Sequence, residues 1–276
     1  DFQKAKKGAV KVTVGISGTG GLTWLGSGTL RLYGSADNTY RGLTRVNGGL
    51  LELAKTPSLF PVLAVPADLV IEAGGTVRLL NDYQIWPYYS RASLTARSGA
   101  LDLNEHQDAV AELVLVNGHV RLGTNGVLTL LSNVTASVGA WIEGTPGRVD
   151  LGGADRTFTV TNWTHTDDFL LQASVRGSGG VIKEGAGLMR LSASNSYAGP
   201  TVVKEGTLTV SHPDGLGGSA GTSVKAGATL ELLSSPFAEF DLTEPLTLGG
   251  AGASTAATLR ALSTLPSFPA TIRCRQ

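Results

Sequence analysis

The chain has 276 residues, of which 37 are glycine, and 42% of its residues are hydrophobic. Glycine at about twice its usual ~7% share, without a three-residue period, excludes collagen and disfavours a mostly helical protein. The 22 basic side chains are balanced by 22 acidic ones, so the chain lacks the basic stripe that nucleic acid requires, and we expect no nucleic-acid partner.

Short alternations of apolar and polar residues follow one another along the chain. A period of two is typical of strands with one buried and one solvent-facing side. The predicted strands include residues 30–32, 51–53, 77–79, 101–103, 120–122, 128–130, 149–151, 208–210, 230–232 and 259–261. A glycine precedes most of them by two to four residues, where a turn with positive φ needs one. The spacing of Gly49, Gly75 and Gly99 is that of one solenoid coil, which predicts short strands stacked coil on coil.

A long internal repeat supports this interpretation. Residues 18–32 match residues 177–191 at a fixed offset, and both copies hold the same five glycines: Gly18, Gly20, Gly21, Gly26 and Gly28, and Gly177, Gly179, Gly180, Gly185 and Gly187. The match resumes after a two-residue gap, with Asn38, Tyr40, Gly42 and Thr44 opposite Asn195, Tyr197, Gly199 and Thr201. Such a repeat buries its strands only against stacked neighbours. We therefore predict one β-helix domain over residues 1–276, with internal repeats at 15–79 and 174–232.

The two copies also predict which side chains face inward. In residues 38–46 the shared Asn38, Tyr40 and Thr44 fall on alternate positions, whereas Arg41 and Arg45 between them differ in the second copy. Because alternate residues of a strand share a face, we expect the shared residues inside and the variable ones outside. An inward asparagine or threonine needs hydrogen-bond partners, which the neighbouring coil can supply.

The motif Gly-Thr-Gly-Gly-Leu-Thr-x-x-Gly-x-Gly-Thr-Leu-x-Leu, followed by Asn-x-Tyr-x-Gly-x-Thr-x-Val-x-x-Gly-x-Leu, resembles the autotransporter-associated β-strand repeat, also called the passenger-associated transport repeat. It occurs at residues 18–53 and 177–210. The resemblance implies an all-β fold, a right-handed single-stranded parallel β-helix (β-solenoid). It also implies a passenger domain displayed on or released from a bacterial cell surface, where the repeat is thought to help folding and export. Residues 80–95 and 263–276 match no repeat unit.

Some β-helix proteins are polysaccharide lyases or hydrolases, which need carboxylates that project together. The richest local set here is Asp102, Glu105, His106 and Asp108, which a solvated turn also explains. The segment 217–221 matches the G-x-S-x-G pattern, but a strand follows it where that motif needs a helix. We therefore predict no catalytic residue and no enzymatic activity.

Metal and cofactor sites are not indicated either. Cys274 is the single cysteine, so no intramolecular disulfide and no cysteine-based metal site can form. The four histidines lack the spacing of zinc ligands, and the calcium-binding nonapeptide of β-rolls is missing. We expect no metal and no cofactor.

Aromatic residues are the candidate binding surface. Trp86, Tyr88 and Tyr89 lie in the non-repeating segment and could stack on a sugar or a partner protein, or fold over the sheet as a local cap. Trp24 occupies the position of Lys183 in the second copy, so we expect its ring to face outward as well.

The predicted function is that of a non-enzymatic structural or adhesive β-helix segment of a bacterial surface or secreted, autotransporter-like protein, with assembly into fibres as a variant. The alternative is a carbohydrate-active β-helix enzyme or a carbohydrate-binding module. Expected partners are further copies of the chain, other surface proteins or glycans. We expect an extracellular or cell-surface location, no signal peptide within this sequence, and no membrane insertion by this segment, because no apolar run approaches ~18 residues.

Overall fold

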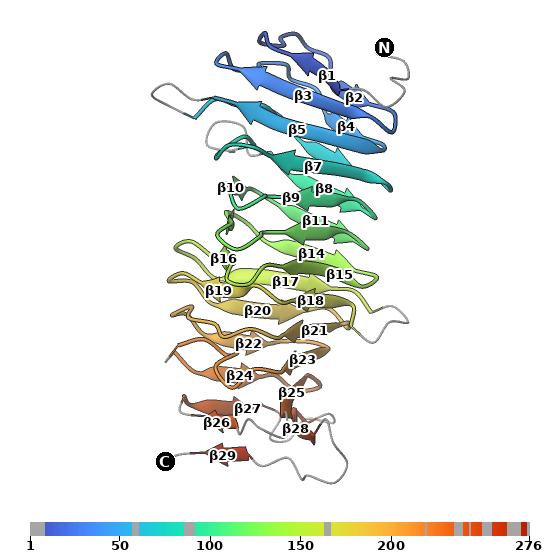
Figure 1. The fold of residues 1–276 in the computed structure, drawn as a ribbon. Helices are drawn as coiled ribbons and strands as arrows, with labels where there is room; N and C mark the ends of the chain where they lie inside the picture. The colour runs from blue at the N-terminus through green and yellow to red at the C-terminus, as the bar shows by residue number, and fades with distance from the viewer. Residues whose placement is uncertain are drawn as a thin grey trace. The chain divides into compact units, whose positions relative to one another are not determined.

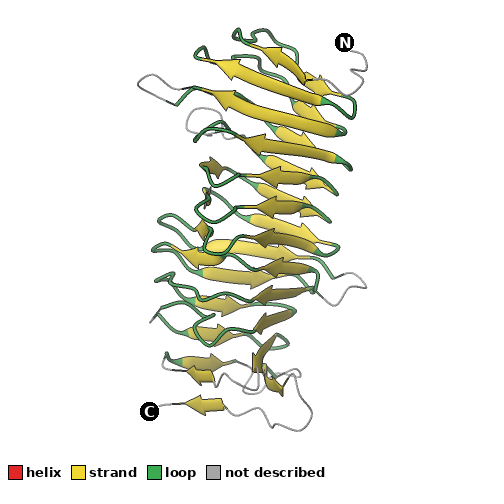
Figure 2. Ribbon diagram, in the orientation of Figure 1, coloured by secondary structure: helices red, strands yellow, loops and turns green. Residues whose placement is uncertain are grey.

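The structure is a computed structural model that describes residues 9–56, 61–85, 92–162, 167–218, 220–234, 240–242, 244–249, 256–263 and 272–274. Within these residues every regular element is a β-strand, joined to the next by turns and loops (Figure 2). The contacts divide the chain into two compact units, residues 1–132 with 142–148 (unit 1) and residues 133–141 with 149–276 (unit 2).

Unit 1 is a solenoid in which successive coils add parallel strands to two long sheets. The first sheet contains, in order, β1 (Ala9–Val12), β3 (Thr29–Gly34), β5 (Gly49–Lys55), β7 (Gly75–Leu79), β9 (Ala100–Asp102) and β12 (His119–Arg121). The second contains β2 (Leu22–Trp24), β4 (Thr44–Val46), β6 (Leu69–Ile71), β8 (Leu94–Arg97) and β11 (Leu113–Val116). A shorter sheet pairs β10 (Gln107–Val110) with β13 (Val127–Leu130). Strands one coil apart lie side by side, as β3, β5 and β7 do in Figure 1.

Unit 2 repeats this arrangement. One sheet contains β18 (Phe169–Leu171), β21 (Leu188–Leu191), β23 (Thr207–Val210), β25 (Thr229–Ser234) and β28 (Thr258–Ser263). Another contains β14 (Val134–Ser137), β17 (Arg156–Val160), β20 (Val181–Glu184), β22 (Thr201–Val203), β24 (Thr222–Val224) and β27 (Leu246–Leu248). The remaining strands are β19 (Ser174–Arg176) and the pair β26 (Phe240–Leu242) and β29 (Ile272–Cys274), while β15 (Ala140–Glu143) and β16 (Arg148–Asp150) have residues in both units.

The fold confirms the predicted all-β solenoid of parallel sheets. Each predicted alternation of apolar and polar residues overlaps a strand. The two repeat copies use the same elements, since β2 to β5 hold the first copy and β20 to β23 the second.

The core consists of rows of aliphatic side chains that stack from coil to coil. Leu32, Leu53 and Leu79 are in register on β3, β5 and β7, and none of the three is exposed to solvent. In unit 2 the rings of Phe158 and Phe169 stack with their centroids 6.2 Å apart. Each fully buried side chain of this size contributes about 1.5–3 kcal/mol to folding. The alternation in the sequence is therefore the pattern of inward and outward side chains.

The two copies share a glycine where the second strand after the Asn-x-Tyr segment begins: Gly49 is the first residue of β5, and Gly206 comes directly before β23. Gly49 has a φ of 61° and Gly206 a φ of 68°, a conformation that disfavours a side chain. A Cβ atom on Gly49 would lie 2.5 Å from backbone oxygens of the preceding coil. Both the backbone conformation and the close approach of the coils require glycine here.

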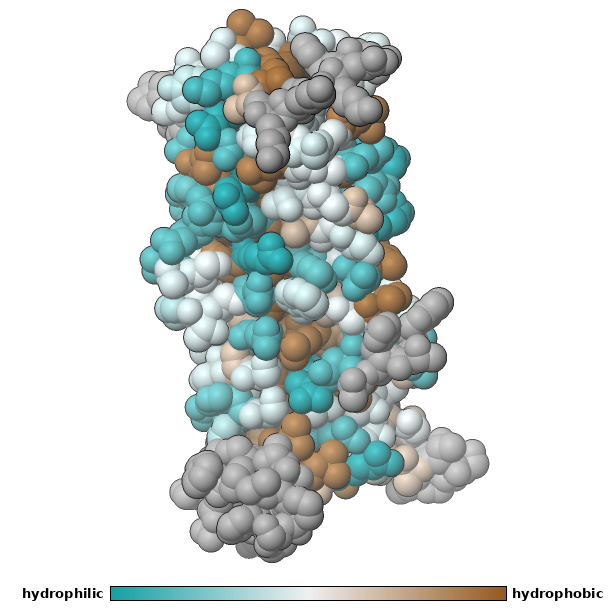
Figure 3. Space-filling view, turned by 45° about the vertical axis from the view of Figure 1, so that its right-hand side comes forward, coloured by the Kyte–Doolittle hydropathy of each residue, from teal (hydrophilic) through white to brown (hydrophobic). Residues whose placement is uncertain are grey.

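The surface mixes residue types. On the face drawn in Figure 3, hydrophilic and hydrophobic residues are interspersed. In unit 1 the exposed large apolar side chains include Val14, Leu25 and Tyr33. Among the described residues, none forms a helix of the length and hydropathy that crossing a membrane requires.

Candidate functional site

The repeat asparagines join three consecutive coils. The side chain of Asn195 is 6% exposed; its Oδ1 accepts a hydrogen bond from the Val175 N–H at 2.8 Å and its Nδ2 donates to the Gly215 carbonyl at 2.7 Å. Asn38 does the same in unit 1, accepting from Ile16 N–H at 2.9 Å and donating to the Ala64 carbonyl at 2.7 Å. Each amide thus satisfies a backbone donor of the preceding coil and a backbone acceptor of the following one.

The repeat tyrosine and threonine form a buried hydrogen-bonded pair. The hydroxyls of Tyr40 and Thr44 lie 2.6 Å apart, and those of Tyr197 and Thr201 are at the same distance. Thr201 also donates to the Leu216 carbonyl of the next coil at 3.1 Å. Burial raises the pKa of Tyr40 to about 12, against a smaller opposing effect of the bond to Thr44, and burial also raises the pKa of Tyr197. These phenols therefore stay neutral and serve as hydrogen-bonding core residues.

The predicted faces of the repeat strand are confirmed. Asn38, Tyr40 and Thr44 are at most 3% exposed, whereas Arg41 is exposed and Arg45 partly exposed. The inward polar residues were thus recognisable from the alternation and from their identity in both copies.

The expectation that Trp24 faces outward is wrong. Trp24 is 2% exposed and Lys183, its counterpart, is fully buried; both pair in register with buried valines of the next coil, Val46 and Val203. The prediction assumed that a lysine must face water. The coil interior accepts it because Lys183 Nζ donates to three backbone carbonyls at the turns, those of residues 184, 185 and 205, at 3.0, 2.6 and 3.0 Å.

Burial of this ammonium has an electrostatic consequence. Desolvation lowers the pKa of Lys183 to about 8, against smaller raising effects of nearby carboxylates. Lys55 in unit 1 is also fully buried, with its Nζ donating to the Val14 carbonyl at 3.2 Å, and burial lowers its pKa as well. Both lysines act as donors to carbonyl groups of the coil turns.

Pairs of arginine and carboxylate side chains lie on the outer face of the first sheet of unit 1. Arg31 Nε lies 2.6 Å from Glu52, and Arg78 Nε lies 2.8 Å from Asp102. In both pairs the partners are opposite each other on strands one coil apart. These pairs are partly exposed, so each contributes about 1 kcal/mol or less. They went unrecognised in the sequence because their partners are a whole coil apart.

The carboxylate set at residues 102–108 does not form a common site. Asp102 pairs with Arg78, and Glu105 accepts a hydrogen bond from the Thr124 hydroxyl at 2.7 Å. Asp108 is 1% exposed and accepts from the backbone N–H groups of residues 84 and 85, at 2.8 and 2.9 Å. These carboxylates are engaged in holding coils together. Within the described part of the chain, no group of three or more His, Cys, Asp or Glu side chains is arranged to hold a metal ion.

The remaining predicted binding residues are three aromatic side chains. Trp86, Tyr88 and Tyr89 lie within residues 86–91, outside the described residues, so their role stays a prediction.

Comparison with known proteins agrees with this geometry. The model of the passenger-associated transport repeat matches residues 18–53 and 181–210, the segments that hold both asparagine bridges and both tyrosine–threonine pairs. The chain carries the passenger-associated transport repeat. Over 143 residues, 52% of this chain, it is 29% identical to the adhesin BmaC autotransporter of Brucella suis biovar 1 (strain 1330). The chain spans 3% of the length of that curated relative. No solved structure matches this chain.

The chain is thus a parallel β-solenoid that carries the passenger-associated transport repeat. The repeat and the likeness to an autotransporter adhesin support a surface or extracellular β-helix segment.

Proposed function

We propose that the chain is a non-enzymatic structural and adhesive segment of a bacterial surface or secreted protein. The observation that carries the proposal is that the polar side chains shared by the two repeat copies form hydrogen bonds within and between coils. Asn38 and Asn195 each bridge three coils, and the tyrosine hydroxyls bond to Thr44 and Thr201. Groups engaged in this way hold the solenoid and are not available for chemistry on a substrate.

The likeness to a protein named as an autotransporter adhesin supports the adhesive part of the proposal. Attachment can be measured with beads coated with the purified chain and placed on epithelial monolayers, with albumin-coated beads as the control. We expect the coated beads to attach in greater number. Equal attachment of both bead types would remove the adhesive part and leave the structural one.

The enzymatic alternative has its own test. Incubation of the chain with a panel of bacterial and host polysaccharides is expected to release no reducing ends or unsaturated products. No activity is expected because Asp102 and Glu105 are both bonded to side chains of neighbouring coils. Product release that disappears in an Asp102→Asn or Glu105→Gln variant would overturn the non-enzymatic assignment.

Fibre assembly is a further part of the proposal, because an end of a solenoid that no further coil covers offers unpaired backbone groups to another copy. Sedimentation velocity over a hundredfold range of concentration tests it. A sedimentation coefficient that rises with concentration is expected for stacking copies, and a constant monomeric value would remove fibre assembly from the proposal.

A further inference from the structure

Charged residues form a row along the outer face of the first sheet of unit 1. Each strand of the sheet, from β1 to β12, contributes one residue at the same register position. In order, these residues are Lys11, Arg31, Glu52, Arg78, Asp102 and Arg121. We call them the charge row. From Arg31 onward the sign of the charge alternates, so each carboxylate of the row lies between two arginines.

The arginines of the charge row are more exposed than the carboxylates to which they are paired. The side chain of Arg31 is 35% exposed and that of Glu52 is 11% exposed, and for Arg78 and Asp102 the values are 41% and 14%. A guanidinium has five N–H donors, of which a bidentate carboxylate takes two, so each arginine keeps donors for a further acceptor. These ion pairs therefore turn their positive ends toward solvent.

The guanidinium groups recur at a regular interval along the row. Neighbouring strands are ~4.8 Å apart, so Arg31 and Arg78, two strands apart, are separated by about 9.6 Å, and Arg121 follows Arg78 at the same interval. The carboxylates between them repel an anionic group at the intermediate positions. A linear anion therefore fits the row best when its negative groups have the interval of the arginines.

Groups suited to a sugar flank two of these arginines. Thr29 and Tyr33 share the outer face of β3 with Arg31, because alternate residues of a strand point to the same side, and Tyr33 is 49% exposed. Thr76 has the same relation to Arg78 on β7. Threonine hydroxyls can bond to sugar hydroxyls, and an exposed tyrosine ring can contact the apolar face of a sugar.

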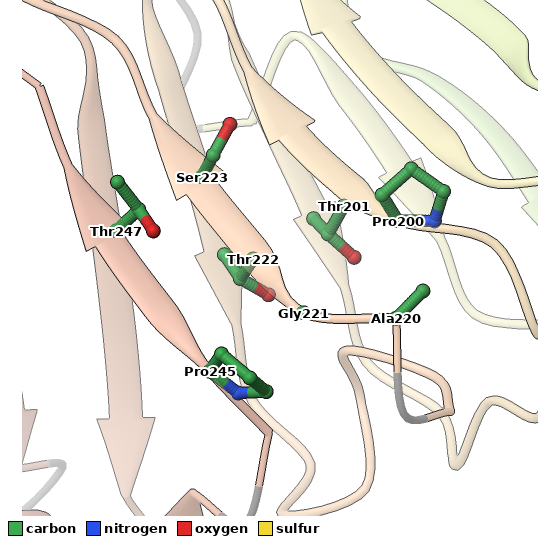
Figure 4. Close-up of a pocket in the computed structure, with 8 residues that line it drawn as sticks. All are labelled: Pro200, Thr201, Ala220, Gly221, Thr222, Ser223, Pro245 and Thr247. Atoms are coloured by element: carbon green, nitrogen blue, oxygen red, sulfur yellow. The ribbon is translucent and has the colours of Figure 1, made fainter.

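The hollow in unit 2 offers no counter-charge for an acidic ligand. It has a volume of about 140 Å³ and lies beside strands β22, β24 and β27, and none of the described residues that line it is charged (Figure 4). Its lining includes Pro200, Gly221 and Pro245. The charge row is therefore the surface on which an acidic ligand meets matching charges.

We propose that the charge row binds a linear polysaccharide in which an acidic sugar alternates with a neutral one. Two sugar residues of an extended chain span about the same length as two strand spacings, so successive carboxylates of such a polymer meet Arg31, Arg78 and Arg121 in turn. Neutral sugars then lie over Glu52 and Asp102, where a further acidic group would be repelled. Each contact at this exposed surface is weak, and the affinity comes from several contacts along one polymer chain.

This inference rests on the adhesive part of the proposed function and names its ligand class. The test is saturation-transfer NMR on the intact chain with hyaluronan octasaccharide, which has a carboxylate on every second sugar. Oligogalacturonate of the same length has a carboxylate on every sugar, and maltooctaose has none. We expect hyaluronan to bind more tightly than oligogalacturonate, and maltooctaose not to bind. No binding of hyaluronan, or equally tight binding of either comparison oligosaccharide, would overturn the proposal.

Arg78→Gln combined with Asp102→Asn tests the row itself. This double variant keeps the net charge and side chains that can still hydrogen-bond to each other, and it removes the central guanidinium. We expect it to bind hyaluronan octasaccharide about tenfold more weakly, while its melting temperature, followed by circular dichroism, changes by only a few degrees.

The matched control is Arg176→Gln combined with Asp150→Asn. It removes an ion pair of unit 2 in which Nε and the carboxylate are 3.2 Å apart and the arginine is 41% exposed, as Arg78 is. We expect this variant to bind like the unaltered chain. A loss of binding that the control shares, or no loss in either double variant, would overturn the assignment to the charge row.

The failure of this site and the failure of the adhesive function give different results. Attachment of coated beads to epithelial monolayers without any binding of hyaluronan would remove the site and leave the adhesive function. Binding of hyaluronan without attachment of the beads would remove the adhesive function and leave the site.

Discussion

Replacing Asn195 by alanine should destabilise unit 2 far more than the loss of one surface side chain. The substitution leaves two buried backbone groups without partners, the Val175 N–H and the Gly215 carbonyl. Each unsatisfied buried group costs about 1–3 kcal/mol, so we expect a loss of about 4 kcal/mol in the free energy of unfolding. The urea midpoint followed by circular dichroism measures this loss, and amide exchange at Val175 reports whether the bond itself has gone.

Asn133→Ala is the matched control. The Asn133 side chain also accepts a backbone hydrogen bond from a neighbouring coil, Thr157 N–H at 3.0 Å, but that bond is exposed to solvent. Water can replace it, so the expected cost is below about 1 kcal/mol. If Asn195→Ala costs no more than Asn133→Ala, or if exchange at Val175 is unchanged, the bridging role assigned to the asparagine is refuted.

Asn195→Asp provides a second diagnosis of the same site. The carboxylate keeps an acceptor for Val175 N–H but places a negative oxygen against the Gly215 carbonyl, which raises the pKa of the new carboxyl. Protonation restores a donor toward that carbonyl. The stability deficit of the variant should therefore shrink as pH falls through the raised pKa, and a deficit independent of pH would contradict the assigned geometry.

Three further predictions concern Lys183, Tyr197 and Gly49. Burial lowers the pKa of Lys183 to about 8 from 10.5, so the unfolded chain holds more protons between these values. The free energy of unfolding should therefore gain a contribution that rises as pH increases from about 8 to 10.5, and Lys183→Met should abolish that contribution. Tyr197→Phe should cost about 1 kcal/mol, and a double-mutant cycle with Thr201→Val should show coupling, since their hydroxyls lie 2.6 Å apart; additive effects would contradict the pair. Gly49→Ala, at a φ of 61°, should lower the free energy of unfolding by at least about 2 kcal/mol in urea titrations, whereas Gly153→Ala, with nothing within 4 Å of its Cβ, should be nearly neutral.

The sequence predicts the strands that pair with β3 in unit 1 and with β25 in unit 2 better than those that pair with β4 and β24. Strands such as β3 and β25 have six residues, enough to show an apolar alternation on their own. Strands β4 and β6 have three residues each and are defined mainly by pairing with strands one coil away. Their positions become visible in the sequence only when the two repeat copies are aligned.

The inward positions that differ between copies could not be predicted. Trp24 and Lys183 share a place in the coil but share neither charge nor shape, and alternation alone assigns a lysine to the outer face. Lys183 is tolerated inside because turn carbonyls of two coils lie within reach of its ammonium, a juxtaposition that no local pattern encodes.

The buried asparagines also explain how one register is selected in a chain of nearly interchangeable strands. A slip of two residues keeps every apolar side chain on the inner face, so the alternation of leucines and valines alone does not distinguish the correct pairing from its neighbours. The amide of Asn38 needs a donor on one side and an acceptor on the other, and it meets both, at 2.9 and 2.7 Å, in the observed register. In a slipped register these groups would be buried without partners, at a cost that apolar packing cannot recover. The repeat therefore specifies which coil positions face each other, while the aliphatic rows supply most of the stability.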